Sequence, residues 1–324
     1  MYFNPQVKES KSDFFNFEVL QEELRMALEN KLTPLIAVYG LRRTGKTSLI
    51  KVVLNSSKRK HVWIDSRDIA SREDFNNKVS DKINSFKKIS IEKITLKGVG
   101  LSLNFFKKGL DYLNKHRIVL VIDEAQLLKR LHLDNTLAFI YDNYPGIKMV
   151  LSGSEAGMLM NFLGKNSAKA PLYGRAVYEI QTYRLNKEYA RVFLGKGLKQ
   201  AKIFFKEEEI MDAVARLGGI IGWLTKYGWY RIRISHKEAL RKTIEEGRYI
   251  SQEEFMRFAA RAEKKYIKII KAVKGGARWE EIKQQALLSD KQLYLMLKRL
   301  INCGFIEKQN RVYTIADPLL EAAM

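Results

Sequence analysis

The stretch VYGLRRTGKTSLI, residues 38–50, decides how the first part of this chain folds. Within it, Gly40, Gly45, Lys46 and Thr47 stand at the spacing G-x-x-x-x-G-K-S/T. The two glycines let the backbone turn tightly, so that its N–H groups point into one anion-binding concavity. The lysine supplies positive charge for the β- and γ-phosphates of a nucleotide, and the threonine supplies a hydroxyl for Mg²⁺. The spacing therefore predicts a phosphate-binding loop.

The residues around this loop provide the context that it needs. PLIAVYG (34–40) is a short apolar run that ends in glycine, which is typical of a buried parallel strand. A helix expected from Lys46 to about Leu54 would offer its N-terminal dipole to the phosphates. Arg42 and Arg43 add positive charge. We therefore predict nucleotide contacts from the whole loop: Gly40, Leu41, Arg42, Arg43, Thr44, Gly45, Lys46, Thr47 and Ser48.

A second motif, VLVIDEAQ (119–126), brings two acids to the end of a buried strand. Asp123 stands where a carboxylate can hold the water shell of Mg²⁺, as the hydroxyl of Thr47 would hold the metal. Glu124 follows directly and can orient and deprotonate an attacking water. The alternative is that these acids only cap the next helix.

A later apolar run ends in LSGS and contributes two hydroxyl groups. Ser152 and Ser154 are both candidates for a contact to the γ-phosphate or to the attacking water. Capping of the next helix is the alternative for each.

The order of apolar runs predicts the fold class. Strands are expected within 34–40, 61–65, 116–128, 146–154 and 176–181, with helical stretches between them, including one over 72–87. This alternation implies an α/β fold, namely a doubly wound, mostly parallel P-loop NTPase sheet with ligands at the carboxyl ends of its strands. Residues 89–103 alternate apolar and polar side chains and predict an inserted β-hairpin.

Composition limits the choice of partner and compartment. Lys and Arg number 58 against 36 Asp and Glu, a formal net charge of +22, and a field of this size attracts polyanions such as nucleic acid. A lysine-rich thermophile surface is the alternative, although such surfaces usually balance Lys with Glu. The chain has no apolar run of membrane-spanning length and no leading signal pattern, so we expect a cytoplasmic protein without membrane contact.

The last part of the chain changes character. From about Thr182 helices dominate, and residues 182–250 are expected to form a helical lid. Residues 251–324 follow the order helix, helix, helix and hairpin, which predicts a winged helix-turn-helix. Its DNA-facing residues would be Lys291, Tyr294, Lys298 and Arg299 on the third helix and Lys308 and Arg311 on the wing. Protein docking or autoinhibition is the alternative use of such a module.

The motifs GLRRTGKTSL, LVIDEAQ, LSGSEAGML and PLYGRA (171–176) together resemble the archaeal P-loop ATPase family, a relative of the AAA+ and STAND ATPases. The resemblance runs from about Leu32 to the last residue. It implies ATP and Mg²⁺ as cofactors, a C-terminal winged helix, and a catalytic role for Arg175, in cis or from a neighbouring copy. Two positions depart from the family pattern: FFNFEVLQEEL lacks an arginine, and Ile221 replaces a proline.

These observations predict an ATPase core over 1–181, a helical lid over 182–250 and a winged helix over 251–324. Glu124, Lys46 and Arg175 are the predicted catalytic residues. ATP or ADP and double-stranded DNA are the expected partners, and a homo-oligomer or a protein partner is left open. The rival interpretation is a slow nucleotide switch in signalling or defence, in which the winged helix docks protein.

Overall fold

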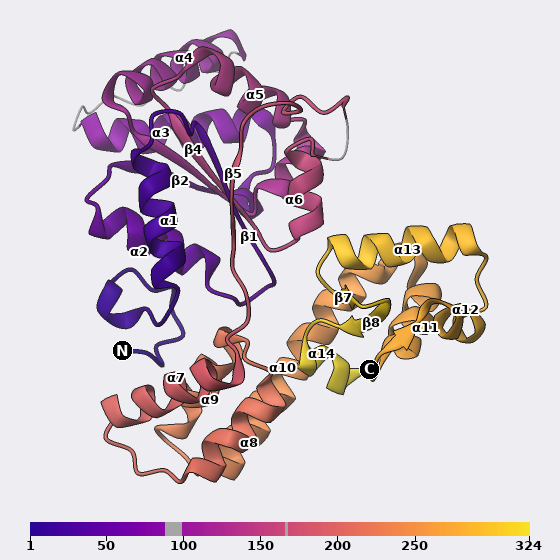
Figure 1. Cartoon of the computed structure of the whole chain (residues 1–324). Coiled ribbons are helices and arrows are strands. Elements are labelled where there is room, and N and C mark those ends of the chain that lie inside the picture. Colours follow the sequence, from indigo (N-terminus) through magenta and orange to yellow (C-terminus); the bar gives the residue numbers. More distant parts are fainter. Residues whose placement is uncertain (88–98, 166–167) are drawn as a thin grey trace.

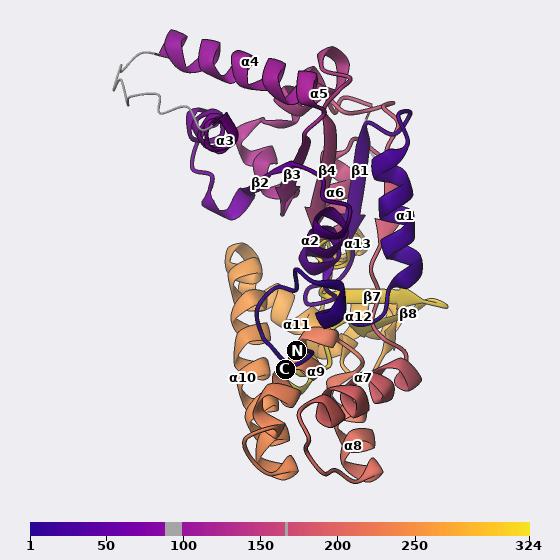
Figure 2. The ribbon, with the colours of Figure 1, turned by 90° about the vertical axis from the view of Figure 1, so that its left-hand side faces the viewer.

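A computed structural model describes residues 1–87, 99–165 and 168–324. It has three regions, which Figure 1 shows from one side and Figure 2 after a quarter turn: a sheet flanked by helices, a helical region below it, and a small C-terminal unit beside both. No helix in these residues is long and apolar enough to cross a membrane.

The first region is built on a parallel sheet. Its strands are β1 (Leu35–Tyr39), β2 (His61–Asp65), β3 (Val119–Asp123), β4 (Lys148–Gly153) and β5 (Tyr178–Gln181). They lie in the order β2-β3-β4-β1-β5, and every neighbouring pair is parallel. The five expected strands and the doubly wound fold are therefore confirmed.

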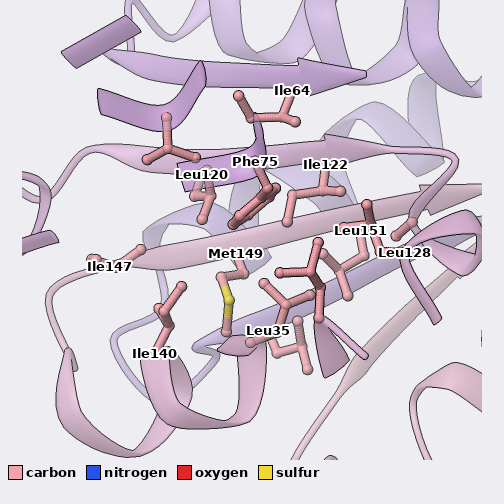
Figure 3. Close-up of a cluster of buried hydrophobic side chains, with 14 of the residues drawn as sticks. Leu35, Ile64, Phe75, Leu120, Ile122, Leu128, Ile140, Ile147, Met149 and Leu151 are labelled. Carbon is pink, nitrogen blue, oxygen red and sulfur yellow. The ribbon is translucent and has the colours of Figure 1, made fainter. Parts of the chain in front are cut away.

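Helices cover both faces of this sheet. One face carries α1 (Glu18–Glu29) and α2 (Lys46–Ser56); the other carries α3 (Arg72–Lys87), α4 (Val99–His116), α5 (Asp134–Asn143) and α6 (Ala156–Phe162). Successive residues of a strand point to opposite faces, so Leu35 packs in the cluster drawn in Figure 3 while Ile36 packs under α1 and α2. Burial on both faces explains why β1 is a continuous apolar run.

One expected element is wrong in part. The predicted hairpin over 89–103 lies outside the described residues as far as 98, but from Val99 onward the chain is helical and belongs to α4. Phe106, Leu110 and Leu113 of α4 are buried at steps of four and three, and they pack against the sheet with α3. This continuing helical period outweighs the short alternation that suggested a strand.

The helical region holds α7 (Lys187–Gln200), α8 (Glu207–Leu217), α9 (Ile221–Arg231) and α10 (His236–Ala259). Its core includes Phe3 from the N-terminal segment. Phe3 lies where a Cβ on Gly197 or on Gly228 would come within 2.2 Å of its ring. The expected boundary between 250 and 251 falls inside α10, which leads from the helical region towards the C-terminal unit (Figure 1).

The C-terminal unit has its own core. It contains α11 (Glu263–Val273), β6 (Ala277–Arg278), α12 (Trp279–Ala286), α13 (Asp290–Asn302), β7 (Ile306–Gln309), β8 (Val312–Ile315) and α14 (Pro318–Ala323). The strands form an antiparallel sheet in the order β6-β8-β7. Ser289 caps α13 by accepting a hydrogen bond from the Gln292 N–H.

Short 3-10 segments complete the chain. They are η1 (Lys11–Asp13), η2 (Ser66–Asp68), η3 (Ala125–Leu131) and η4 (Ala260–Ala262). Of these, η2 follows β2 directly and η3 follows β3 after Glu124, so both begin at the edge of the sheet where the phosphate loop lies.

Candidate functional site

A cavity of about 470 Å³ opens at the carboxyl edge of the parallel sheet. The loop after β1 forms one wall, and residues that follow β2, β3 and β4, together with Glu254 of α10, form the others. Its lining consists of Arg42, Arg43, Gly45, Lys46, Thr47, Ser48, Arg67, Glu124, Gln126, Leu127, Ser154, Glu155 and Glu254. Most of the loop residues predicted from sequence therefore come together in one place.

Lys46 begins α2 and is almost fully buried, with a relative exposure of 6%. Its ammonium group donates to the backbone oxygens of Gly40 at 3.1 Å and Leu41 at 2.6 Å. Burial lowers the pKa of Lys46 to about 8, although the charges of Glu124 and Asp123 act in the opposite direction. The ammonium group is thus held by carbonyl oxygens of the loop, and a phosphate group that binds there can compete with these oxygens for it.

The first part of the loop is closed against the chain that follows β5. Gly40 has a φ of 150°, and a Cβ at this position would lie 2.3 Å from the Thr182 backbone oxygen. The buried hydroxyl of Thr44 donates to the Leu41 oxygen at 2.8 Å and lies 2.7 Å from the Thr182 hydroxyl. Glycine is needed at position 40 because no side chain fits there.

Asp123 does not line the cavity but is buried directly beside it, in contact with Thr47. Thr47 Oγ1 donates to Asp123 Oδ2 at 3.1 Å, and Ser152 Oγ donates to Oδ1. Burial raises the pKa of Asp123, and the nearby charge of Glu124 raises it further, while the two hydroxyls act against this. The predicted metal residues Thr47 and Asp123 are therefore adjacent. Ser152 is fully buried beneath the cavity and supports Asp123.

Glu124 has a left-handed backbone, with φ of 52°, which is uncommon for a residue with a side chain. Three donors converge on its Oε2 atom: the Ser154 N–H at 3.1 Å, the Ser154 hydroxyl at 2.8 Å and Gln126 Nε2 at 2.7 Å. Among the residues that the structure describes, no hydrogen bond reaches Oε1. The carboxylate is thus held in place by one oxygen and faces the cavity with a free acceptor.

Arg42 reaches from the loop into the C-terminal unit. It donates to the Cys303 backbone oxygen at 2.8 Å and to Glu155 at 2.6 Å, and its guanidinium lies 5.1 Å from the centre of the Phe305 ring. Burial raises the pKa of Glu155, and the charge of Arg42 opposes that rise.

The side chain of Arg43 also points away from the loop, towards α10 and α14. It makes a two-pronged contact with Glu254 of α10, at 2.6 and 3.2 Å, and lies 3.8 Å from Asp317, the N-cap of α14. Its guanidinium stacks 4.3 Å from the centre of the Trp223 ring. From the sequence, Arg42 and Arg43 are expected to direct their positive charge at phosphates. In the structure both side chains instead contact carboxylates, three in all.

A second cavity, of about 560 Å³, adjoins the loop on its other side. Gly45 and Ser48 border it together with aromatic side chains of the N-terminal segment and of α9, among them Phe14, Phe15 and Trp229. The Lys8 N–H donates to the Ser48 hydroxyl at 3.0 Å and ties the N-terminal segment to α2. The segment that lacks the family's arginine therefore still lies beside the loop.

Arg175 lies at the opposite edge of the sheet from the loop. It precedes Tyr178, the first residue of β5, and β5 is parallel to β1, whose last residue leads into the loop. Its guanidinium contacts Asp142 at 3.0 and 2.5 Å, and it also donates to the Pro171 oxygen. The role in cis that the resemblance implies is therefore corrected, because Arg175 does not line the cavity; a role in a neighbouring copy stays a prediction.

The residues predicted to face DNA are all exposed in the C-terminal unit. They are Lys291, Tyr294, Lys298 and Arg299 on α13, Lys308 on β7, and Arg311 at the turn between β7 and β8. The other end of α13 packs on the core: a Cβ on Gly157 of α6 would lie 2.3 Å from the Asn302 side chain. Part of this helix is thus free and part is engaged.

Five of the residues that line the cavity carry no predicted role from the sequence. These are Arg67, Gln126, Leu127, Glu155 and Glu254. The first four follow directly after predicted strands or stand beside predicted motifs, so their position after a strand was a usable signal. Glu254 lies in α10 and carries no local signal. No group of three or more acidic, histidine or cysteine side chains in the described residues could hold a metal by itself.

Comparison with known proteins agrees with this site. A family model described as an ATPase domain predominantly from Archaea matches residues 14–226, well over half of the chain. The Walker-type ATPase PABY2304 of Pyrococcus abyssi is 29% identical and superposes with a TM-score of 0.89, covering 100% of this chain and 99% of that one. The ORC1 protein of Aeropyrum pernix, solved in complex with DNA, shares the fold at 15% identity and a TM-score of 0.50, over 96% and 92% of the two chains.

A curated relative, the uncharacterized protein MJ1637 of Methanocaldococcus jannaschii, is 26% identical over 204 residues. That match covers 61% of this chain but only 35% of the relative, so the chain corresponds to about a third of that protein's length. The family match spans the phosphate loop, the acidic pair after β3 and most of the walls of both cavities. The chain therefore belongs to the family of ATPase domains found predominantly in Archaea.

Proposed function

We propose that this chain hydrolyses ATP with Mg²⁺ and couples the state of the nucleotide to binding of double-stranded DNA through its C-terminal unit. The observation that carries the coupling is the position of Arg42 and Arg43. Both belong to the phosphate loop, line its cavity, and contact Glu254, Asp317 and the Cys303 carbonyl in α10 and the C-terminal unit.

Hydrolysis is supported by the arrangement of Glu124. Its Oε2 is held by Ser154 and Gln126, so that Oε1 can accept a proton from a water in the cavity. General-base catalysis of this kind is worth about 10²–10⁴ in rate. Lys46 would exchange its two loop carbonyls for phosphate oxygens, and the backbone N–H groups of the loop would do the rest of the binding.

Thr47 on the cavity wall and Asp123 buried beside it fit Mg²⁺. Thr47 and Asp123 offer a hydroxyl and a carboxylate 3.1 Å apart, and oxygen atoms are the ligands that Mg²⁺ prefers. Mg²⁺ is usually held by one or two carboxylates together with substrate phosphates, so a site with few protein ligands is expected. When bound, the ion would neutralise charge on the phosphates.

The second cavity supports a place for the nucleotide base. It adjoins Gly45 and Ser48, so a nucleotide with its phosphates in the loop could extend its base between Phe14 and Trp229. Aromatic and apolar walls suit the flat face of a base. The preference for ATP rests on the family.

The C-terminal unit supports DNA binding by its order of elements. A helix, a short strand, two helices and a two-stranded hairpin (α11 to β8) are the parts of a winged helix-turn-helix. Lys291, Tyr294 and Lys298 are exposed on α13, where a recognition helix presents its base contacts, and Arg311 is exposed at the tip of the hairpin. The net charge of +22 would strengthen binding to a polyanion.

One observation favours a second candidate function, a nucleotide switch whose C-terminal unit grips its own core. Asn302 at the end of α13 packs on Gly157 of α6, and Arg184 after β5 makes an ion pair with Glu307 of β7 at 2.7 Å. In a switch, these contacts would hold the C-terminal unit on the core in the resting state. A partner protein would then bind the C-terminal unit in their place.

The test is ATP turnover by the purified chain while duplex DNA is titrated in at low salt. We expect DNA to stimulate turnover and Glu124→Gln to lower it by a factor of about 10²–10⁴. Lys291→Ala with Lys298→Ala should weaken DNA binding and lower its salt dependence by about one unit for each phosphate that the variant no longer neutralises. Turnover that DNA leaves unchanged, at concentrations where DNA binds, would contradict the coupling and favour the switch.

A further inference from the structure

Arg67 lines the same cavity as the phosphate loop, although it belongs neither to that loop nor to the motif VLVIDEAQ. It lies in η2, directly after β2, and β2 is the neighbour of β3. In the register of this pair Asp65 stands beside Asp123. Because the strands are parallel, a residue just past Asp65 enters the same edge of the sheet as the acids that follow β3.

The guanidinium of Arg67 is held from one side only. Asp65 accepts from Nε at 2.9 Å and from Nη2 at 2.5 Å, and it also accepts from the Arg67 backbone N–H at 3.0 Å. Among the described residues, no hydrogen bond reaches Nη1, and the side chain is 64% exposed. The carboxylate therefore orients the group and leaves donors for a ligand.

The other basic side chains that line the cavity have different partners. Arg42 and Arg43 bind carboxylates that precede α6 or belong to α10 and the C-terminal unit, and Lys46 binds carbonyls of the loop. Asp65 raises the pKa of Arg67, and Asp123 and Glu124 add to that effect, which indicates that the guanidinium lies within the field of the acidic pair. Arg67 is thus placed across the cavity from the loop, on the side of the acids.

We propose that Arg67 contacts the terminal phosphate of bound ATP and stabilises the negative charge that develops on the transferring phosphoryl group. This inference rests on the proposed hydrolysis. In that step the water oxygen bonds to the γ-phosphorus, its proton passes to Glu124, and the bond to the bridging oxygen breaks, so that ADP leaves with the electron pair. An arginine suits this position because its planar fork matches phosphate oxygens and stays charged.

The experiment compares Arg67→Ala and Arg67→Lys with Arg25→Ala in the full chain. Arg25 is a matched control, because it is an exposed arginine held by Glu22 and Glu29 on α1, outside the cavity. Removal of an arginine that contacts the transferring phosphoryl group costs about 10³–10⁵ in kcat, so we expect at least a 10²-fold loss in Arg67→Ala. Arg67→Lys should recover part of this loss, and ADP binding should be unchanged in both variants.

Wild-type kcat in Arg67→Ala, or an equal loss of ATP and ADP affinity, would overturn the proposal. Binding of ADP with aluminium fluoride, which imitates the transferring group, gives a readout that needs no turnover, and Arg67→Ala should lose it while Arg25→Ala keeps it.

Failure of the proposed hydrolysis would look different. In that case the wild-type chain shows no turnover that depends on Glu124. The contact of Arg67 is then tested by the ratio of ATP to ADP affinity, which should fall about tenfold in Arg67→Ala if a charged hydrogen bond of ~1.5 kcal/mol is removed. An unchanged ratio, in a variant that melts at the wild-type temperature, overturns the proposal on its own.

Discussion

The two halves of the phosphate loop are held by different parts of the chain. The half from Gly45 to Ser48 begins α2 and faces the acids after β3, with Thr47 bound to Asp123. The half before it sends Arg42 and Arg43 away from these acids, to α10 and the C-terminal unit. The difference suggests a division of work within one loop, in which the later residues serve the chemistry and the earlier ones report on it to the rest of the chain.

The largest expected effect is on the rate of ATP hydrolysis and comes from a change at Glu124. Glu124→Gln keeps the shape of the side chain and its place beside Ser154 but removes the proposed base. We expect kcat to fall by about 10²–10⁴ while ATP still binds. Turnover close to that of the wild type would show that another group accepts the proton, and a loss of ATP binding would show that Glu124 has a structural role.

The packing of the N-terminal segment on the helical region gives the next largest effect. A Cβ at position 228 would meet the ring of Phe3 at 2.2 Å, so Gly228→Ala should destabilise the chain by about 1–3 kcal/mol through overpacking. Urea unfolding measures this cost. In a Phe3→Ala background the same change should cost much less, because the ring that it strikes is gone; an equal cost in both backgrounds would contradict the packing described here.

A smaller effect should come from the support of the base. Ser154→Ala removes one of three donors to Glu124 Oε2 and leaves the backbone N–H in place. Loss of one hydrogen bond to a charged group is worth ~1.5 kcal/mol, so we expect kcat to fall about tenfold with KM for ATP unchanged. A change in KM alone would assign Ser154 to phosphate binding instead.

The smallest effect concerns the first half of the loop. Glu254→Gln weakens the pairing with Arg43 and keeps the volume of the side chain. We expect turnover to respond less to duplex DNA, measured as the ratio of rates with and without DNA, since the carboxylate no longer links the loop to α10. Glu253→Gln, an exposed neighbour, is the control; equal changes in both variants would indicate a general effect of charge.

The parts of this arrangement that sequence predicts are those written in local patterns. β2 runs from His61 to Asp65 as expected, because a short apolar run between polar residues has clear ends. Lys46, Thr47 and Asp123 meet because strand ends in a parallel sheet share an edge. The partners of the loop arginines could not be predicted in this way, since Arg43 and Glu254 are 211 residues apart in the chain.

Two other predictions differ from the structure, and in both the cause is again a contact between distant parts of the chain. The family motif assigns a role to Arg175, but its place before β5 puts it at the amino edge of the sheet, where Asp142 pairs with it. Residues 99–103 alternate like a strand, yet they begin a helix whose apolar face is completed by residues further along the chain. In both cases the tertiary setting decides what the local pattern leaves open.

Cys303 offers the most direct measurement of the link between the loop and the C-terminal unit. It is the single cysteine of the chain and is buried, and its backbone oxygen accepts from Arg42. Burial raises the pKa of its thiol to about 12, so it stays protonated and should react slowly with iodoacetamide at pH 8. The residue belongs to the core of the C-terminal unit. We expect a movement of that unit away from Arg42 to loosen the chain around it and to increase its exposure.

The decisive measurement is therefore the rate of Cys303 alkylation in the Glu124→Gln chain, without nucleotide, with ADP and with ATP and Mg²⁺. The account predicts that ATP speeds alkylation, because its phosphates draw Arg42 and Arg43 from their carboxylates, and that Arg42→Ala speeds it without nucleotide. A rate that ATP leaves unchanged, at concentrations where ATP is bound, would contradict the claim that one loop serves both the nucleotide and the C-terminal unit.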